Sequence, residues 1–206
     1  VILTADTAGR PFSFAASGTG TWSGDANTTE SVSNNDYGQA TNWSTDAVPT
    51  SADDVVLGDG TVAIKYGLNQ SAVTIDEFNV TSGWTGDIGR VEDGKLHYLR
   101  IDPDSFNYYG RSQLAAFDLG SANISVAIQG SGTPSTTGGN AVYLKGSNLA
   151  TVSVNSGNVG IAAADNDTAT VATVRVNQLT GVTAPTVVVG SGTTLTTLSA
   201  SAGTIT

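Results

Sequence analysis

Carboxylates close to a basic residue are the groups in this chain that could catalyse hydrolysis or elimination. Asp102 and Asp104 follow Arg100 directly. A second acidic group lies upstream and consists of Asp53, Asp54 and Asp59. Hydrolysis of a glycoside needs two carboxylates at a defined separation, and a lyase would need Asp ligands for Ca²⁺ with Arg or Lys as the base. Since Asp102-Pro103-Asp104 is also typical of a turn, a polysaccharide hydrolase or lyase remains an alternative reading.

Other catalytic and ligand-binding motifs are missing from the sequence. His97 is the only His, and no Ser lies in the glycine pattern of a nucleophile elbow. The absence of Cys excludes a thiolate metal site and a Cys nucleophile. Asp165 and Asp167 flank Asn166, but the Gly and Glu of a Ca²⁺-binding EF-hand loop are absent, which predicts a solvated corner. We therefore expect no catalytic residue, no cofactor and no metal site.

Aromatic residues mixed with Arg distinguish residues 90–118 from the sequence around them. Such mixtures are enriched at binding surfaces. Residues 1–40 are rich in Gly, Ser, Thr and Asn, and we expect either an extended arm whose aromatic residues anchor it on a neighbouring subunit or a partly ordered surface region. The predicted partner-binding residues are Phe12, Phe14, Trp22, His97, Tyr98, Arg100, Phe106, Tyr108, Tyr109 and Arg111. The alternative for residues 90–118 is a loop packed on its own flank, and a glycan is a further possible ligand.

The balance of charge limits the partners of the chain. Its 206 residues include 18 Asp and Glu but only 8 Lys and Arg, which gives a formal net charge of −10. Nucleic acid binding needs clustered Lys and Arg, and we therefore expect no nucleic acid partner. No apolar run is long enough for a membrane helix, and the sequence does not begin with a basic and apolar leader. We expect no membrane partner.

A short pattern recurs in the last third of the chain and predicts the fold. The sequences LATVSV (149–154), VATVRV (171–176) and LTTLSA (195–200) align at spacings of 22 and 24 residues. Each is a period-2 strand followed by turn residues, and no unit has helical periodicity. Strands of successive units would stack about 4.8 Å apart in parallel sheets. The pattern predicts an all-β parallel β-helix with coils of about 22–24 residues, which we expect to have three faces.

The position of the repeat also predicts the domain organisation. Its first copy is IDEFNV (75–80), so the solenoid begins near residue 55. We expect an N-terminal arm and cap over residues 1–54, a β-helix over residues 55–206, and an aromatic and charged insertion at about residues 90–118. Period-2 parity turns Thr151, Thr173 and Thr197 outward as a ladder. The final strand ends without a polar cap, so the last coil is expected either to contact another subunit or to continue.

The sequence around the expected cap carries a resemblance to known proteins. The residues concerned are Trp22, Asn42-Trp43-Ser44, Val48-Pro49, 53–57 and 67–73. This sequence resembles a segment found at the start of β-helix regions in structural proteins of tailed bacteriophages and, more weakly, in autotransporter-like bacterial surface proteins. The resemblance covers roughly residues 20–83 and implies a β-helix cap without implying a chemistry.

Together these features predict a non-enzymatic structural protein of a virion. The resemblance implies a capsid decoration (cement) protein on the outer head surface, whose partners are the major capsid protein and further copies of itself in a homotrimer. The solenoid also carries little charge from residue 119 onward, which is an association hazard unless a neighbour covers it. The alternatives are a tail fibre or spike component, a secreted β-helix adhesin at the cell surface, and a polysaccharide lyase or hydrolase.

Overall fold

The structure is a computed structural model that describes residues 34–130, 141–164 and 166–206. In this part of the chain, the secondary structure is β-strand apart from one short 3-10 helix, η1 (Ala40–Asn42). The strands are β1 (Asp54–Leu57), β2 (Asn69–Val80), β3 (Arg90–Glu92), β4 (Lys95–His97), β5 (Leu99–Tyr108), β6 (Ala115–Asp118), β7 (Ser125–Ile128), β8 (Val142–Lys145), β9 (Leu149–Val154), β10 (Asn158–Ile161), β11 (Ala169–Val176), β12 (Thr186–Val189), β13 (Thr193–Ala200) and β14 (Thr204–Ile205).

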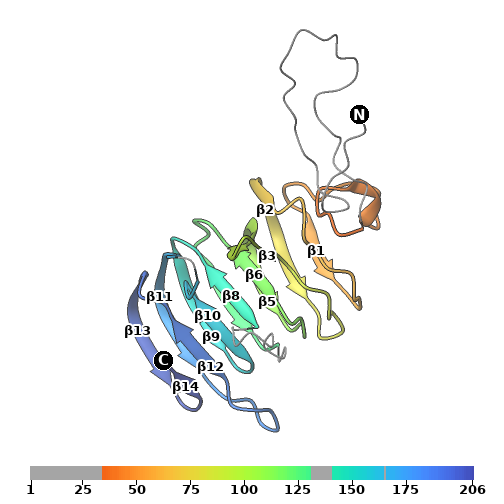
Figure 1. Ribbon diagram of the computed structural model, residues 1–206. Helices are drawn as coiled ribbons and strands as arrows, with labels where there is room; N and C mark the ends of the chain where they lie inside the picture. Colours follow the sequence, from red (N-terminus) through yellow and green to blue (C-terminus); the bar gives the residue numbers. More distant parts are fainter. Residues whose placement is uncertain (1–33, 131–140, 165) are drawn as a thin grey trace.

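The strands stack in two parallel columns. One column contains β1, β2, β5, β7, β9, β11 and β13, and the other contains β6, β8, β10, β12 and β14. From β5 onward successive strands alternate between the columns, and the chain winds as a parallel β-solenoid of about six turns (Figure 1). The predicted fold class is therefore confirmed. The expectation of three faces stays a prediction, and the connections on either side of β9 have three residues each.

The strand register confirms the repeat. Leu149 pairs with Val171 and Val171 with Leu195, in the order that the sequence alignment predicts. Thr173 lies between Thr151 and Thr197, so the outward Thr ladder is also present. Turns close the coils at Gly157 and Gly203, whose φ values of 85° and 109° favour Gly over other residues.

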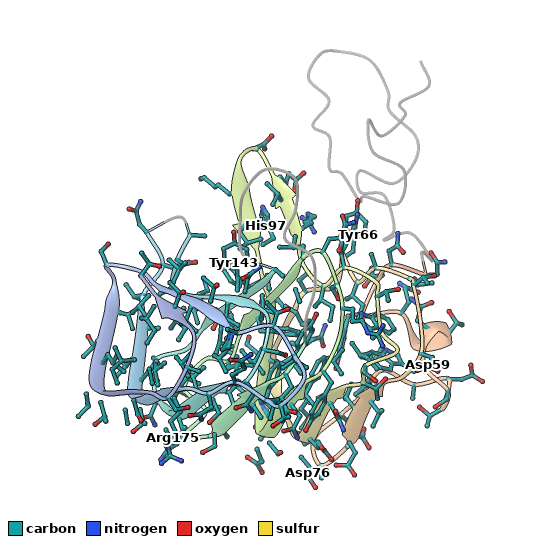
Figure 2. All side chains as sticks on the ribbon, turned by 90° about the horizontal axis from the view of Figure 1, so that it is seen from below. Asp59, Tyr66, Asp76, His97, Tyr143 and Arg175 are labelled. Carbon is teal, nitrogen blue, oxygen red and sulfur yellow. The ribbon has the colours of Figure 1, made fainter. Side chains whose placement is uncertain are left out.

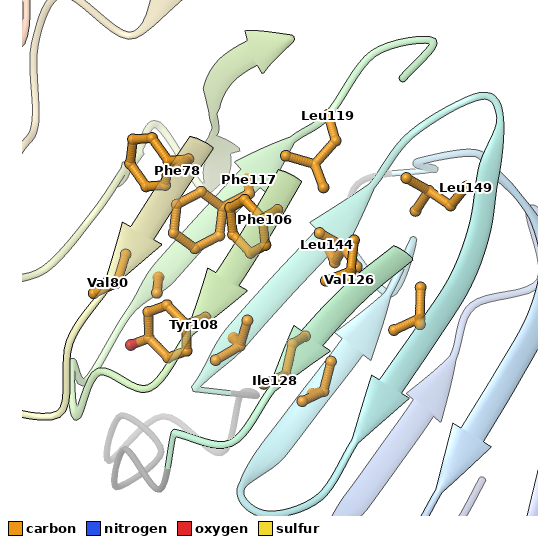
Figure 3. Close-up of a cluster of buried hydrophobic side chains, with 14 of the residues drawn as sticks. Phe78, Val80, Phe106, Tyr108, Phe117, Leu119, Val126, Ile128, Leu144 and Leu149 are labelled. Atoms are coloured by element: carbon orange, nitrogen blue, oxygen red, sulfur yellow. The ribbon is translucent and has the colours of Figure 1, made fainter. Parts of the chain in front are cut away.

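The core runs along the solenoid axis as stacked inward side chains. One column of the core is Val55, Phe78, Phe106, Val126, Val152 and Val174, and the next is Leu57, Val80, Tyr108, Ile128, Val154 and Val176. Phe78 stacks on Phe106 with ring centroids 5.8 Å apart, and Phe117 from the opposite column packs edge-on against both (Figure 3). Aromatic packing of this kind contributes about 0.5–1.5 kcal/mol per pair beyond the burial of area.

Coil length varies more than the repeat predicts. Phe106 and Val126 are stacked neighbours 20 residues apart, whereas Phe78 and Phe106 are 28 residues apart. The longer coil contains the antiparallel hairpin β3–β4, which projects from the solenoid (Figures 1 and 2). The insertion expected at about residues 90–118 is therefore confined to this hairpin. Residues 99–108 and 115–118 are strands of the solenoid itself.

Residues 36–48 cover the first coil. Tyr37 is buried, and Trp43 packs edge-on against it with ring centroids 4.7 Å apart. The indole Nε1 of Trp43 donates a hydrogen bond of 2.9 Å to the backbone oxygen of Tyr37. Trp43 and Val48 both pack against the core cluster. The phenol of Tyr37 is shielded from water, and burial raises its pKa well above the ordinary value.

Asp53 joins this cap to β1, and its pKa is expected to lie below that of an ordinary Asp. Its Oδ2 accepts hydrogen bonds from the backbone N–H of Thr50 at 2.7 Å and from the Thr50 hydroxyl at 3.0 Å. These bonds favour the carboxylate and lower the pKa of Asp53. The stabilisation is therefore present above the unfolded pKa of about 3.9 and is lost as the pH falls through the lower folded pKa. An NMR titration of the Asp53 carboxyl carbon should show the lowered pKa, and Thr50→Ala should raise it part of the way. Titration at the ordinary Asp pKa in both proteins would contradict this prediction.

Candidate binding surfaces

The structure separates the predicted partner-binding residues into distinct groups. Phe12, Phe14 and Trp22 lie outside the described residues. Phe106 and Tyr108 are fully buried in the core. Their assignment to a partner-binding surface was wrong, because period-2 alternation in β5 turns both side chains inward. Burial also raises the pKa of Tyr108, although Ser112 donates a backbone N–H to its hydroxyl oxygen at 3.3 Å.

Tyr109 and Arg111 lie in the turn that follows β5. Their backbone N–H groups donate to the oxygens of Val80 and Trp84 in the preceding coil, at 2.7 and 2.8 Å. The Arg111 residue is exposed and Tyr109 is half-buried. These two residues are thus held on a surface where a partner could reach them.

His97, Tyr98 and Arg100 lie together where the hairpin rejoins the solenoid. Arg100 occupies β5, beside Asn69 of β2 and Asp118 of β6 in the register. Its guanidinium contacts the Asp102 carboxylate at 3.0 Å and lies 3.7 Å from Asp118 Oδ1. The candidate catalytic carboxylate Asp102 is therefore engaged in an ion pair with its neighbouring base.

The same corner continues along the solenoid as a charge network. Lys145 of β8 stacks beside Asp118, with its Nζ 4.0 Å from Asp118 Oδ2 and 3.0 Å from Asp167 Oδ1. Tyr98 donates its hydroxyl hydrogen to Asp167 Oδ2, and Lys145 Nζ lies 4.1 Å from the centre of the Tyr98 ring. We call Tyr98, Arg100, Asp118, Lys145 and Asp167 the corner network. It joins side chains from four successive coils, with cations and carboxylates in alternation.

A smaller cluster supports the base of the hairpin. Arg90 donates to Glu92 Oε2 at 3.0 Å and to the backbone oxygen of Lys65 at 2.5 Å. Its guanidinium lies 5.0 Å from the centre of the Tyr66 ring. His97 Nε2 is 3.9 Å from Glu92 Oε2. These contacts fix the hairpin to the preceding coil, beside the corner network.

A second surface is the outward side of β7, β9, β11 and β13. One row on it is Ser125, Thr151, Thr173 and Thr197, and the next is Ala127, Ser153, Arg175 and Ser199. Arg175 is the only charged residue in these four strands. We call this surface the low-charge face. In Figure 2, Arg175 and Asp76 mark the side of the molecule opposite to Tyr66 and His97.

Sequence reasoning missed two features of the corner. Asp167 was predicted to lie in a solvated corner, but its side chain is only 8% exposed and is paired with Lys145. Nothing local in the sequence signals this contact, because the partners of Asp167 are 22 and 69 residues away.

The hairpin β3–β4, in contrast, had a signal in the sequence. Asp93-Gly94 takes positive φ values of 51° and 73°, as the two-residue turn of a hairpin requires.

The described residues contain no group of three or more His, Asp or Glu placed to hold a metal ion. Within the same ranges, no helix is long and apolar enough to cross a membrane. No protein family model matches the chain, and no curated protein or solved structure is significantly similar to it. The fold makes the chain a parallel β-solenoid protein, and the resemblance to phage and bacterial surface proteins stays a prediction.

Proposed function

We propose that the chain is a non-enzymatic structural protein of a virion, which decorates the outer surface of the head as a cement protein. The observation that carries the proposal is the low-charge face. A chain of net charge −10 keeps this broad surface almost free of charge, with hydroxyl and methyl groups from Ser, Thr and Ala in regular rows. The cores of protein interfaces are depleted of charged residues in the same way.

The size of the low-charge face indicates how such a protein would attach. Four strands about 4.8 Å apart, with an average length of roughly 20 Å, present a surface of about 400 Å². A stable interface buries about 800 Å² on each partner. The face alone is therefore too small for a tight one-to-one complex. A homotrimer that contacts the major capsid protein several times would gain the missing affinity through multivalency.

The stacked core fits a mechanical role. Each coil is fastened to the next by ladder hydrogen bonds and by interlocked side chains such as Phe78, Phe106 and Phe117. Such a body transmits force between attachment points with little deformation. Cross-linking of capsid subunits against internal pressure needs this property. The tail fibre or spike remains the alternative with the same fold.

The proposal is tested with heads of the virus that encodes the chain. The protein should co-sediment with expanded heads, and its mass in solution should be three times that of the chain. Ser125→Glu places a carboxylate on the low-charge face away from Arg175, and a buried unpaired charge costs several kcal/mol. We expect the variant to bind heads at least about 100-fold more weakly, equivalent to about 2.7 kcal/mol.

Thr183→Glu is the matched control, because Thr183 is exposed in the loop between β11 and β12, away from the four strands. This variant should bind heads like the original protein. A monomer that does not sediment with heads would overturn the proposal. If the gene lies among tail genes and the protein binds only to tails, the protein is a tail fibre or spike component instead.

A further inference from the structure

Three shallow depressions follow one another along the corner of the solenoid. Their volumes are about 590, 520 and 350 Å³. Arg100 lines both the first and the second depression, and Asn166 and Asp167 line both the second and the third. Neighbouring depressions share lining residues, and we call the three together the corner groove.

The corner groove runs across the strands, parallel to the solenoid axis. Asn69, Arg100, Asp118 and Lys145 line it from four successive coils in direct register. The third depression extends it past the corner after β10 to Gly190. Five coil steps of about 4.8 Å give a length of roughly 24 Å. A groove of this shape fits an elongated ligand better than a compact one.

The charges of the groove are compensated within the protein. Arg100 is paired with Asp102 and Asp118, and Lys145 is paired with Asp118 and Asp167. A polyanion would have to break these pairs and approach a protein of net charge −10. Nucleic acids and acidic polysaccharides are therefore disfavoured, and the groove is suited to a neutral ligand.

A peptide also fits the groove poorly. Peptides in extended conformation pair with a sheet edge and place side chains in apolar pockets. The corner groove crosses strands whose backbone groups already pair with each other. The central depression has no apolar side chain, since its lining consists of Arg, Lys, Asp, Asn, Ser, Thr and Gly.

Sugar hydroxyl groups match this lining. Each hydroxyl can donate to a carboxylate and accept from a guanidinium or ammonium group, so alternating acids and bases suit a row of hydroxyls. The first depression adds the rings of Tyr66 and Tyr98, which offer apolar area beside polar groups. Arg90 and Lys145 lie over these two rings and hold them in place. We propose that the corner groove binds a linear, neutral oligosaccharide along the solenoid axis.

This inference does not rest on the decoration of a capsid. The corner groove and the low-charge face lie on different sides of the coils, so a glycan could bind while the low-charge face is occupied. The two proposals therefore fail separately, one by loss of binding to heads and the other by loss of binding to sugars.

The test uses the full chain and a panel of neutral hexasaccharides of glucose, mannose, xylose and N-acetylglucosamine, with a galacturonate hexamer as the anionic comparison. At least one neutral hexamer should bind in calorimetry and shift the NMR signals of Arg100 and Gly146. It should bind at least about tenfold more tightly than its disaccharide, because the longer chain fills more of the groove.

Ser121→Trp supplies the decisive variant. Ser121 is exposed and lines the central depression, so an indole there obstructs the groove. We expect affinity to fall at least about tenfold, whereas Ser82→Trp, at an exposed turn outside the three depressions, should leave it unchanged. The proposal is overturned if no neutral hexamer binds, if only the galacturonate hexamer binds, or if Ser121→Trp binds like the original protein.

Discussion

Replacing Phe106 with alanine should lower the free energy of unfolding by about 3–5 kcal/mol, the usual cost of such a truncation in a core. Phe106 is fully buried. Its ring stacks on Phe78 and packs edge-on against Phe117, with centroids 5.8 and 4.8 Å apart. Removal of the ring leaves a cavity at the centre of a one-dimensional stack. Both neighbouring coils therefore lose contacts, and the surrounding structure cannot easily collapse into the space.

Chemical denaturation followed by far-ultraviolet circular dichroism measures this loss. Phe106→Leu, which fills part of the cavity, should fall between the original protein and Phe106→Ala. Tyr109→Ala is the matched control from the same strand end, and it should cost about 1 kcal/mol or less because Tyr109 is half-buried in a turn. Equal losses for Phe106→Ala and Tyr109→Ala would show that the stacked aromatic core does not dominate stability.

The contrast between these residues shows why the fold was predictable and the site only partly so. The repeat fixed the parity of β9, β11 and β13, since Val152, Val174 and Leu198 recur at one register position. In the middle of the chain the alternation was obscured by polar and aromatic residues. Phe106-Asn107-Tyr108 repeats Phe78-Asn79-Val80 in register, and this local match could have placed both aromatic side chains inside.

The candidate site depends on information that no single stretch of sequence contains. Arg100, Asp118, Lys145 and Asp167 belong to four coils of unequal length, so their spacing of 18, 27 and 22 residues shows no period. Stacking brings them to one corner through backbone register, and only the three-dimensional arrangement pairs their charges. The scarcity of charge after residue 119 was visible in the sequence. The clustering of charged side chains at the corner was not visible in the sequence.

The contacts of Tyr98 also could not be predicted from the local sequence. The sequence analysis selected Tyr98 because it lies close to Arg100 in a segment that mixes aromatic residues with Arg. Its contact with Asp167 and its position over Lys145 depend on where the hairpin rejoins β5. A partner-binding residue predicted from composition thus belongs to a network within the chain itself. That network shapes the groove available to a ligand.

Gly190→Ala should be the most disruptive small substitution at the corner, and we expect a loss of about 3 kcal/mol of folding stability. A Cβ at this position would lie only 1.7 Å from the backbone oxygen of Ala162 in the preceding coil. The corner cannot simply move outward, because the Gly190 N–H donates to the oxygen of Ile161 at 2.8 Å. Overpacking costs about 1–3 kcal/mol, and loss of the hydrogen bond adds about 1 kcal/mol.

The effect of Gly190→Ala should be confined to one end of the stack. In a solenoid each coil contacts mainly its neighbours, so a weakened interface frays the coils beyond it before the rest unfolds. Hydrogen exchange should accelerate in β12, β13 and β14 and stay unchanged in β5 and β6. Gly58→Ala is the control, because a Cβ at Gly58 meets nothing within 4 Å. Uniform acceleration along the whole chain would contradict this picture and would make the solenoid a single cooperative unit.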